Sequence, residues 1–272
     1  MDPIVQGALL SAGFSAILKL GDGPFKTVSD YWYMTFGHNI AMKRAKYEAK
    51  VKAFEQECVQ ELQAIPKENR QEPRMCVIGP AIAQAQYFVE EESLRKMFAK
   101  LIASASDSRR FTVAHPAFVD IISQLSPFEA KILQDTNILQ ATIACCKIRF
   151  QQSTGDKPLT FTSMNQGHTI IEHFVTFDNP PVDHDEMQLY SSLLDNLTRL
   201  KLCEIPPNYT LTDDTLYNKY LNMPILQQHI ANYINSFSWP KEYDNYNAFF
   251  LKETVTPTAF GEQFYVACIQ ST

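Results

Sequence analysis

The sequence predicts a mainly α-helical protein, with an N-terminal helical region and a winged-helix-like C-terminal domain that carries a small β wing. Three observations support this fold class. A long apolar stripe with helical spacing lies before residue 65, and Ser126–Glu129 matches an S-x-x-E capping box with proline at the first helical position. The stretches "NLTRLKLCEI" and "VTPTAFGEQF" follow the order of the third helix, wing and last helix of a winged helix. We therefore expect two domains, at residues 1–112 and 113–272, with an insertion at about 206–247 in the second.

The first helix expected is apolar and has one face almost bare of side chains. Residues 3–18 carry no charge for 16 residues, which is short of the roughly 20 that a membrane-spanning helix needs. Small residues recur in this stretch at Gly7, Ser11, Ala12 and Ser15. Such a face lets another backbone approach closely, so we predict a face for oligomer or membrane contact. Tight helix packing within the fold is the alternative.

A long amphipathic helix is expected from about residue 38 to 65. One apolar stripe recurs at steps of three and four residues, at Tyr47, Val51, Phe54, Cys58, Leu62 and Ile65. The first half of the helix is basic and the second half is acidic, an order that opposes the helix dipole. This polarity indicates an antiparallel partner helix or an anionic surface near the basic half, with a solvated face of i, i+4 pairs as the alternative. Residues 65–74 then form a polar linker.

The central segment predicts further helices with distinct start signals. One begins at Pro80 and is interrupted near Ser93, and another follows the His115-Pro116 pair. The capping box Ser126–Glu129 starts a helix that we expect to continue to about residue 143. The β-branched and aromatic stretches "LTFTSM" and "HTIIEHFVTF" favour short strands or loops.

The last third of the sequence supplies the expected wing. A helix is predicted from about Asp183, with inward-facing leucines at helical spacing, namely Leu189, Leu193, Leu194, Leu197 and Leu200. The strand after it should pair with the strand before the last helix. A Tyr- and Asn-rich insertion separates these two strands, and we expect one helix within it, at about 224–237.

Composition and charge narrow the classes of function. Residues 1–136 hold 16 basic and 16 acidic residues, whereas residues 137–272 hold 8 basic and 14 acidic residues, so the C-terminal half alone carries the net charge of −6. None of the six cysteines forms a C-x-x-C pair, and we expect reduced, mostly buried thiols. Adjacent Cys145 and Cys146 are interpreted as neighbouring apolar positions of a helix, with a redox-active pair as the alternative. Asp2 stands where a secretory signal peptide would carry a basic residue, which favours a cytoplasmic protein.

No motif in the sequence specifies a reaction. G-x-S-x-G, H-E-x-x-H, P-loop and G-x-G-x-x-G patterns are absent, so we predict no catalytic, cofactor-binding or metal-binding residues. The stretch "DHDE" at 183–186 offers possible metal ligands, but acidic residues are also expected in the first turn of a helix. The same acidic residues stand where a winged helix would enter DNA, and carboxylates next to phosphates disfavour binding. We therefore do not expect DNA to be a partner of this helix.

Three stretches carry a resemblance to a known family: "SLRKMFAKLIASASD", "VAHPAFVDIISQLSPFEAKIL" and "VTPTAFGEQFYVACI". Together they resemble the bacterial abortive infection alpha family. The resemblance covers Pro80–Ala141 well and Leu193–Ile269 in outline. The matching positions are helix starts and core residues, which mark a fold and not an active site, namely His115, Pro116, Leu125, Ser126, Pro127, Glu129, Ala130, Leu200 and Gly261.

The resemblance implies a role in bacterial defence against bacteriophage, through arrest or death of the infected cell. The family offers no catalytic residues to carry over. We expect a non-enzymatic protein that acts through a protein partner or a homo-oligomer, and contact with the inner membrane surface through residues 3–20 is an open alternative. A nucleic-acid-binding regulator that uses the basic stretch Lys43–Lys52 is the competing hypothesis, and an enzyme with an unrecognised site is a third.

Overall fold

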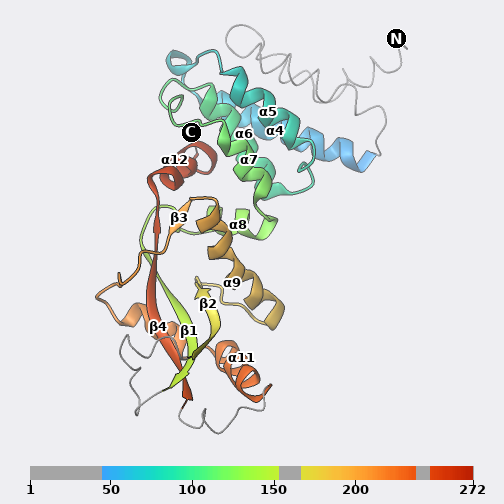
Figure 1. Ribbon diagram of the computed structural model, residues 1–272. Coiled ribbons are helices and arrows are strands. Elements are labelled where there is room, and N and C mark those ends of the chain that lie inside the picture. The colour runs from blue at the N-terminus through green and yellow to red at the C-terminus, as the bar shows by residue number, and fades with distance from the viewer. Residues whose placement is uncertain (1–44, 153–166, 237–245, 272) are drawn as a thin grey trace. The chain divides into compact units, whose positions relative to one another are not determined.

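The computed structural model describes residues 45–152, 167–236 and 246–271 (Figure 1). These residues divide into two compact units. The first unit contains the described residues up to Asp135 together with the segment from Ala259, and the second contains the described residues of Thr136–Thr258. The domain boundary predicted at residues 112–113 lies within the first unit. The predicted face of Gly7, Ser11, Ala12 and Ser15 lies outside the described residues and stays a prediction.

The first unit is helical and is organised around α6 (Glu92–Ala105). Ten of the 14 residues of α6 are buried, which makes it the central helix of this unit. It packs against the other α-helices described in the unit, which are α4 (Ala45–Ala64), α5 (Met75–Ala85), α7 (Ala117–Gln124), α8 (Pro127–Asp135) and α12 (Ala259–Cys268). A short 3₁₀ helix, Lys67–Asn69, lies in the predicted linker.

The apolar stripe predicted for α4 is confirmed where side chains are described. Val51, Phe54, Cys58, Leu62 and Ile65 are all buried. The acidic second half of this helix has a specific use, because Glu57 forms a bidentate ion pair with Arg95 of α6, with both N–O distances at 2.8 Å. Glu57 therefore pairs with a neighbouring helix, and the antiparallel orientation of a partner helix stays a prediction.

The helix predicted to begin at Pro80 starts five residues earlier, at Met75. Pro80 lies inside α5 and removes one backbone hydrogen bond from it. The helix persists because buried apolar residues flank the proline on both sides, among them Ile78, Ala81 and Ile82. Burial against neighbouring helices here outweighs a local start signal.

Two predicted helix starts are confirmed in atomic detail. The His115 ring nitrogen Nδ1 accepts a hydrogen bond from the Ala117 backbone N–H at 3.1 Å, and Pro116 is the N-cap of α7. At the start of α8, the Glu129 backbone N–H donates to Ser126 Oγ at 3.2 Å, and the Ser126 backbone N–H donates to Glu129 Oε2 at 2.7 Å. This is the reciprocal capping box that the sequence predicts.

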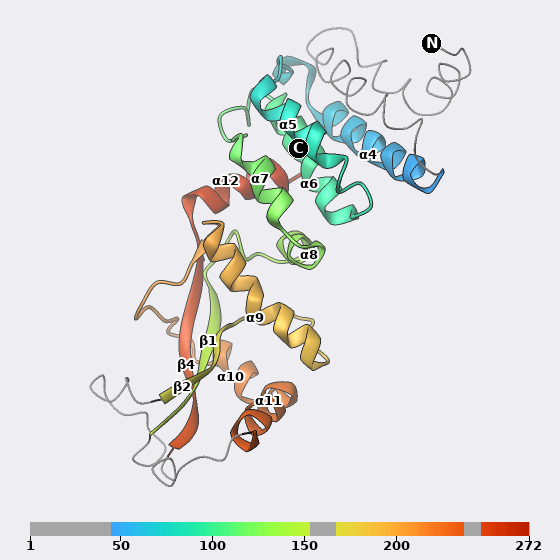
Figure 2. The same cartoon turned by 45° about the vertical axis from the view of Figure 1, so that its right-hand side comes forward.

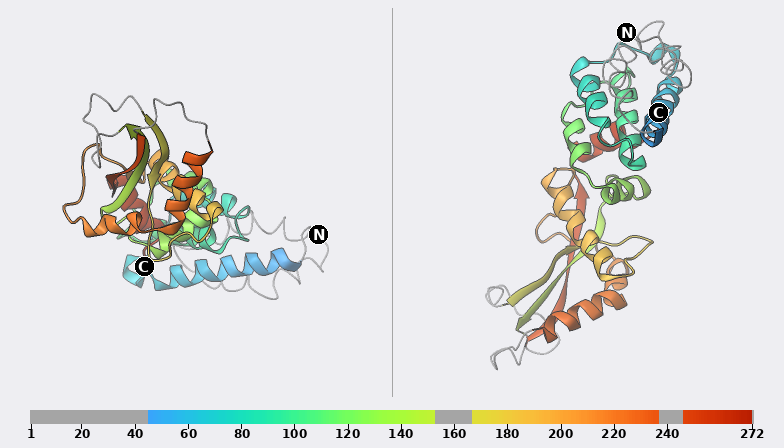
Figure 3. Two further views of the ribbon diagram at one scale, coloured as in Figure 1. Left: turned by 90° about the horizontal axis from the view of Figure 1, so that it is seen from below. Right: turned by 90° about the vertical axis from the view of Figure 1, so that its right-hand side faces the viewer.

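The second unit combines an antiparallel sheet with helices (Figure 2). The described residues form a four-stranded sheet in the order β2-β1-β4-β3. Its strands are β1 (Ile143–Gln152), β2 (Gly167–Phe174), β3 (Cys203–Glu204) and β4 (Tyr246–Pro257). Helix α9 (His184–Arg199) packs against β2 and β3, α10 (Thr215–Leu221) packs against β1, and α11 (Pro224–Asn235) packs against α9. Figure 3 gives two further views of these elements.

The fold is therefore mixed and not all-α, because the sheet is larger than the small β wing that the sequence predicts. The helix expected to run to residue 143 ends at Asp135, and β1 begins at Ile143. Cys145 and Cys146 lie in this strand and not in a helix. The strand forms because β1 pairs over ten residues with β4, about 100 residues later in the sequence. Local periodicity cannot report a partner at that distance.

The predicted wing pair is present, but it is a minor part of the sheet. Cys203 pairs with Pro257 and Glu204 with Thr256, as expected for the strand after the third helix and the strand before the last one. The rest of β4 pairs with β1. The winged-helix assignment itself is not shown. The insertion contains the predicted helix, α11, and a second helix, α10, that was not predicted.

The start of α9 explains the acidic stretch at 183–186. Asp183 is the N-cap, and its Oδ1 accepts a hydrogen bond from the Glu186 backbone N–H at 2.8 Å. Glu186 Oε2 in turn accepts from the Val182 backbone N–H at 2.8 Å. These carboxylates thus serve a helix start. Leu193, Leu194, Leu197 and Leu200 are buried as predicted, but Leu189 is 45% exposed, so its inward placement is wrong.

Candidate functional site

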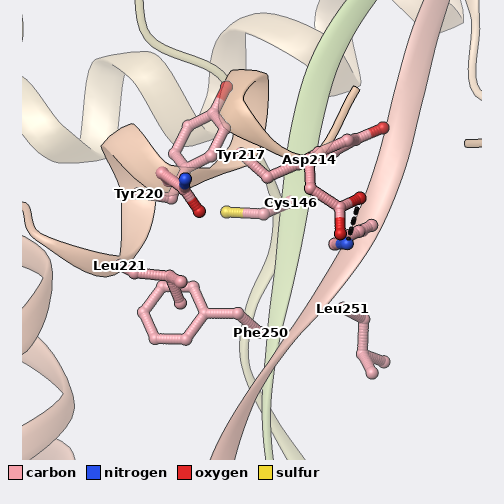
Figure 4. A pocket seen from close by; sticks show the side chains of 9 residues that line it. Cys146, Asp214, Tyr217, Tyr220, Leu221, Phe250 and Leu251 are labelled. Carbon is pink, nitrogen blue, oxygen red and sulfur yellow. Dashed lines mark hydrogen bonds and ion pairs between the residues drawn. The ribbon is translucent and has the colours of Figure 1, made fainter. Parts of the chain in front are cut away.

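A cavity of about 260 Å³ lies in the second unit, between α10 and the strands β1 and β4 (Figure 4). Strand β1 contributes Cys146, and β4 contributes a run of three residues that ends at Lys252. The opposite wall of the cavity comes from α10 and from Asp214, the residue before this helix. The lining consists of Cys146, Asp214, Tyr217, Asn218, Tyr220, Leu221, Phe250, Leu251 and Lys252.

Helical and strand geometry bring these residues together. Tyr217, Tyr220 and Leu221 stand three and four residues apart, so they share one face of α10. Cys146 and Lys252 are directly opposite each other in the antiparallel pair of β1 and β4, so their side chains lie on the same face of the sheet. The cavity is the space left between these two faces.

The two tyrosines attach α10 to the sheet. Tyr220 Oη donates to the Ala144 carbonyl oxygen at 2.7 Å, and Tyr217 Oη donates to the Glu253 carbonyl oxygen at 3.1 Å. Tyr217 Oη also accepts a hydrogen bond from the Leu211 backbone N–H at 3.0 Å. Burial raises the pKa of both phenols, so both stay protonated at neutral pH. They act as fixed hydrogen-bond donors and not as acid–base groups.

Cys146 presents a thiol to the cavity. Its sulfur points into the space beside Leu221 and Phe250, whereas Leu251 points away (Figure 4). Burial, and secondarily the charge of Glu253, raises the pKa of Cys146 far above its usual value. The thiolate is the nucleophile in cysteine chemistry, so this protonated thiol is an apolar wall group. The same causes raise the pKa of Cys145, which argues against a redox-active pair.

The rim of the cavity carries both charge and exposed apolar surface. Lys252 Nζ donates to Asp214 Oδ1 at 2.7 Å, and it also lies 5.5 Å from the centroid of the Tyr217 ring. The Asp214 side chain is 72% exposed and that of Lys252 is 43% exposed. Leu221, which lines the cavity, is 48% exposed, and Leu216 on the same helix is 44% exposed.

Apart from Cys146, the described residues singled out from the sequence do not line this cavity. His115, Pro116, Ser126, Pro127 and Glu129 start α7 and α8 in the first unit, and their roles are structural. Gly261 is buried in α12.

The described histidines, cysteines and carboxylates outside this cavity do not form a metal site. Within the described ranges, no group of three or more His, Cys, Asp or Glu side chains is placed to hold a metal ion. His173 on β2 pairs with Glu253 on β4, with Nδ1 and Oε2 2.8 Å apart. Hydrogen bonding to Glu253 raises the pKa of His173.

Sequence reasoning missed the cavity itself. The i, i+3, i+4 spacing of Tyr217, Tyr220 and Leu221 was a usable signal for a helix within the insertion. Nothing local indicated that Cys146 and Lys252 would stand opposite each other, because strand register depends on the pairing of β1 with β4.

The comparison with protein families decides which family the chain belongs to. The family model described as abortive infection alpha (Abi_alpha) matches residues 46–268, which is most of the chain. This chain belongs to the abortive infection alpha family. The family match spans the segment from α4 to the end of α12 and therefore includes residues of both units. Membership in the abortive infection alpha family implies a role in abortive-infection defence against bacteriophage.

Comparisons with curated proteins and with solved structures identify no relative of this chain. No curated protein and no solved structure shows significant similarity to the chain. In the part of the chain that the structure describes, no helix combines the length and apolarity required to span a membrane.

Proposed function

We propose that this member of the abortive infection alpha family protects bacteria against phage by contacting another protein, without catalysis of its own. The family match over residues 46–268 is the observation that carries the defence role. In abortive infection the infected cell stops growing or dies before the phage is released. Such a response requires a trigger and a target, and a protein contact can supply either.

The surface around α10 supports the protein-contact part of the proposal. Leu216 and Leu221 are nearly half exposed and lie on the helix that walls the cavity. Exposed apolar side chains beside a hollow are typical of protein interaction sites. Tyr209, in the segment that leads to this helix, is also exposed. We infer that this surface makes the contact on which defence depends.

The competing interpretations place the contact elsewhere. A nucleic-acid-binding regulator would use the basic stretch Lys43–Lys52, with a winged-helix scaffold for which the order α9, β3, β4 is the supporting feature. The exposed residues of α9 include Asp185, Asp195 and Leu189, a combination that suits protein better than DNA. Oligomer or membrane contact through residues 3–20 would not depend on the α10 surface. Variants of the α10 surface in a plaque assay therefore distinguish the two contacts.

A plaque assay with surface variants tests the proposal. Leu216→Glu and Leu221→Glu place charge on exposed positions, so we expect folding to be unchanged and protection to be lost. Asn232→Glu on α11 is the matched control, because Asn232 is also an exposed helical position and does not line the cavity. Protection is measured as the efficiency of plating over a panel of phages, with survival of infected cells counted in parallel.

Each outcome bears on one part of the proposal. Full protection by both leucine variants would refute the contact through α10. If the wild-type chain gave no protection against any phage in the panel, the defence role would be contradicted. Steeply salt-dependent DNA binding by the purified chain would favour the regulator hypothesis.

A further inference from the structure

The size of the α10 cavity limits what can occupy it. Small-molecule and cofactor sites are typically about 300–1,000 Å³ in volume. At about 260 Å³ this cavity lies below that range. A single large side chain needs less space than a cofactor and enters from the surface, as anchor residues do at protein interfaces. The size therefore favours one inserted side chain.

The chemistry of the wall defines that side chain. Phe250, Leu221 and the protonated thiol of Cys146 present apolar surface to the cavity. The hydroxyl groups of the two tyrosines are already hydrogen-bonded to strand carbonyls, so the rings, and not the hydroxyls, remain for a ligand. An apolar or aromatic occupant therefore packs against the tyrosine rings while both tyrosine hydroxyls keep their hydrogen bonds to the strand carbonyls.

The charge at the rim defines what must stand beside the anchor. Asp214 is the more exposed partner of the ion pair with Lys252. A carboxylate offers about four acceptor positions, so Asp214 can bind a second cation while it keeps Lys252. Asp213, the preceding residue, is also exposed, so an incoming carboxylate would meet two like charges. Lys219 adds no free cation at this edge, because its Nζ donates to the Thr176 carbonyl oxygen at 2.6 Å.

We propose that the cavity receives one large apolar or aromatic side chain of a protein partner, and that Asp214 binds a lysine or arginine adjacent to that anchor. This inference rests on the proposed action through protein contacts. It adds the chemistry of the partner: an anchor residue next to a basic residue on the partner's surface.

Short peptides test this chemistry with the full-length chain. The probes are the blocked peptides Gly-Lys-Trp-Gly, Gly-Glu-Trp-Gly and Gly-Lys-Ala-Gly, with a fluorine label on each tryptophan or on the N-terminal acyl group. Binding is followed by fluorine NMR titration. We expect Gly-Lys-Trp-Gly to bind about fivefold more tightly than Gly-Glu-Trp-Gly, which is the scale of an exposed charge pair. Gly-Lys-Ala-Gly, which has no anchor, should not bind.

Two variants assign the binding to the cavity. Asn218→Phe places a ring at the mouth from an exposed position, so it should abolish binding without disturbing the core. Asn232→Phe adds the same ring to an exposed position of α11 and should leave binding unchanged. Asp214→Lys should reverse the preference, so that Gly-Glu-Trp-Gly becomes the tighter ligand.

Several results would overturn the inference. It fails if Asn218→Phe retains wild-type affinity, or if the Lys and Glu peptides bind equally. If free zwitterionic tryptophan binds as tightly as the Lys-Trp peptide, the cavity is a metabolite site instead. Failure here is separable from failure of the proposed function. If the wild-type chain binds no peptide but protects against phage, only the anchor site is refuted, whereas if it binds the peptide but gives no phage protection, only the defence role is refuted.

Discussion

In the first unit a central helix is buried among other helices over most of its length, whereas in the second unit a short helix is attached to a sheet by polar side chains. Helix α6 shows the first pattern, with ten of its 14 residues buried among neighbouring helices. Helix α10 shows the second, since Tyr217 and Tyr220 donate to carbonyl oxygens of β4 and β1. Lys219 on the same helix donates to the carbonyl oxygen of Thr176.

This difference determines where a site can form. Close-packed helical layers leave few voids, because apolar side chains interdigitate. A short helix held to a sheet by tyrosine side chains stands away from the strands and leaves space between them. The cavity of the second unit is such a space. In the proposed function, the first unit contributes mainly stability and the second unit presents the binding surface.

The largest expected effect concerns the core of the first unit. Phe118 is fully buried, and its ring centroid lies 5.0 Å from that of Phe260 and 5.2 Å from that of Phe264. Replacing it by alanine should lower the free energy of unfolding by about 3–5 kcal/mol. Hydrogen exchange should lose protection in residues 45–135 and 259–271 and keep it in the second unit.

The same variant also distinguishes two divisions of the chain. By the boundary predicted from the sequence, Phe118 belongs with residues 113–272, whereas the compact units place it with the N-terminal helices. If protection fell across β1 and β4 but not α4, the sequence-based boundary would be correct. If protection fell equally everywhere, the two units would unfold as one, and they would not differ in stability.

A smaller effect is expected for the tyrosine attachment in the second unit. Tyr220→Phe removes the hydroxyl that donates to the buried Ala144 carbonyl oxygen and leaves that acceptor without this donor. We expect a loss of about 1–2 kcal/mol in the free energy of unfolding, measured by chemical denaturation. Tyr209→Phe is the control, because Tyr209 is 52% exposed, and it should change stability by less than about 0.5 kcal/mol. Equal stability of the Tyr220 variant and the wild type would show that polar attachment contributes little to this unit.

The smallest effect is a pH dependence confined to the second unit. Hydrogen bonding to Glu253 raises the pKa of His173 above its value in the unfolded chain. The stability from this pair is therefore fully present below the unfolded pKa of about 6.5 and is lost as the pH rises through the folded pKa. The pair is partly exposed, so we expect a contribution of about 0.5 kcal/mol.

The free energy of unfolding, measured as a function of pH for the wild type and for Glu253→Gln, checks this expectation. The wild type should lose stability in the second unit as the pH rises from about 6.5 through the folded pKa of His173, and Glu253→Gln should flatten that part of the profile. Glu172 and Asp195 also favour the protonated histidine, so the flattening should be incomplete. A wild-type stability that increases over the same range would contradict the assignment.

Local signals in the sequence determined much of the first unit and one part of the second. The stripe of α4, the His115-Pro116 start of α7, the capping box of α8 and the helix at Pro224 all follow from residues within one or two turns of each other. Such signals depend on short-range spacing and on side chains that bond to nearby backbone groups. The family motifs lie largely in these segments, which is why the family was recognised from the sequence. The β3–β4 pair was also predicted, because β3 directly follows the predicted helix α9 and β4 directly precedes the predicted last helix, α12.

Only the tertiary structure decided the sheet and the cavity. Ile143–Gln152 carried enough apolar residues for a helix or a strand, and its pairing with Tyr246–Pro257 settled the choice. The exposure of Leu189 was decided in the same way, by what α9 packs against and not by its spacing. Cys146, Tyr217, Tyr220 and Lys252 are separated by up to 106 positions in the sequence, and no spacing rule connects them. Strand pairing at long range places them together, since register alone determines which side chains stand opposite one another.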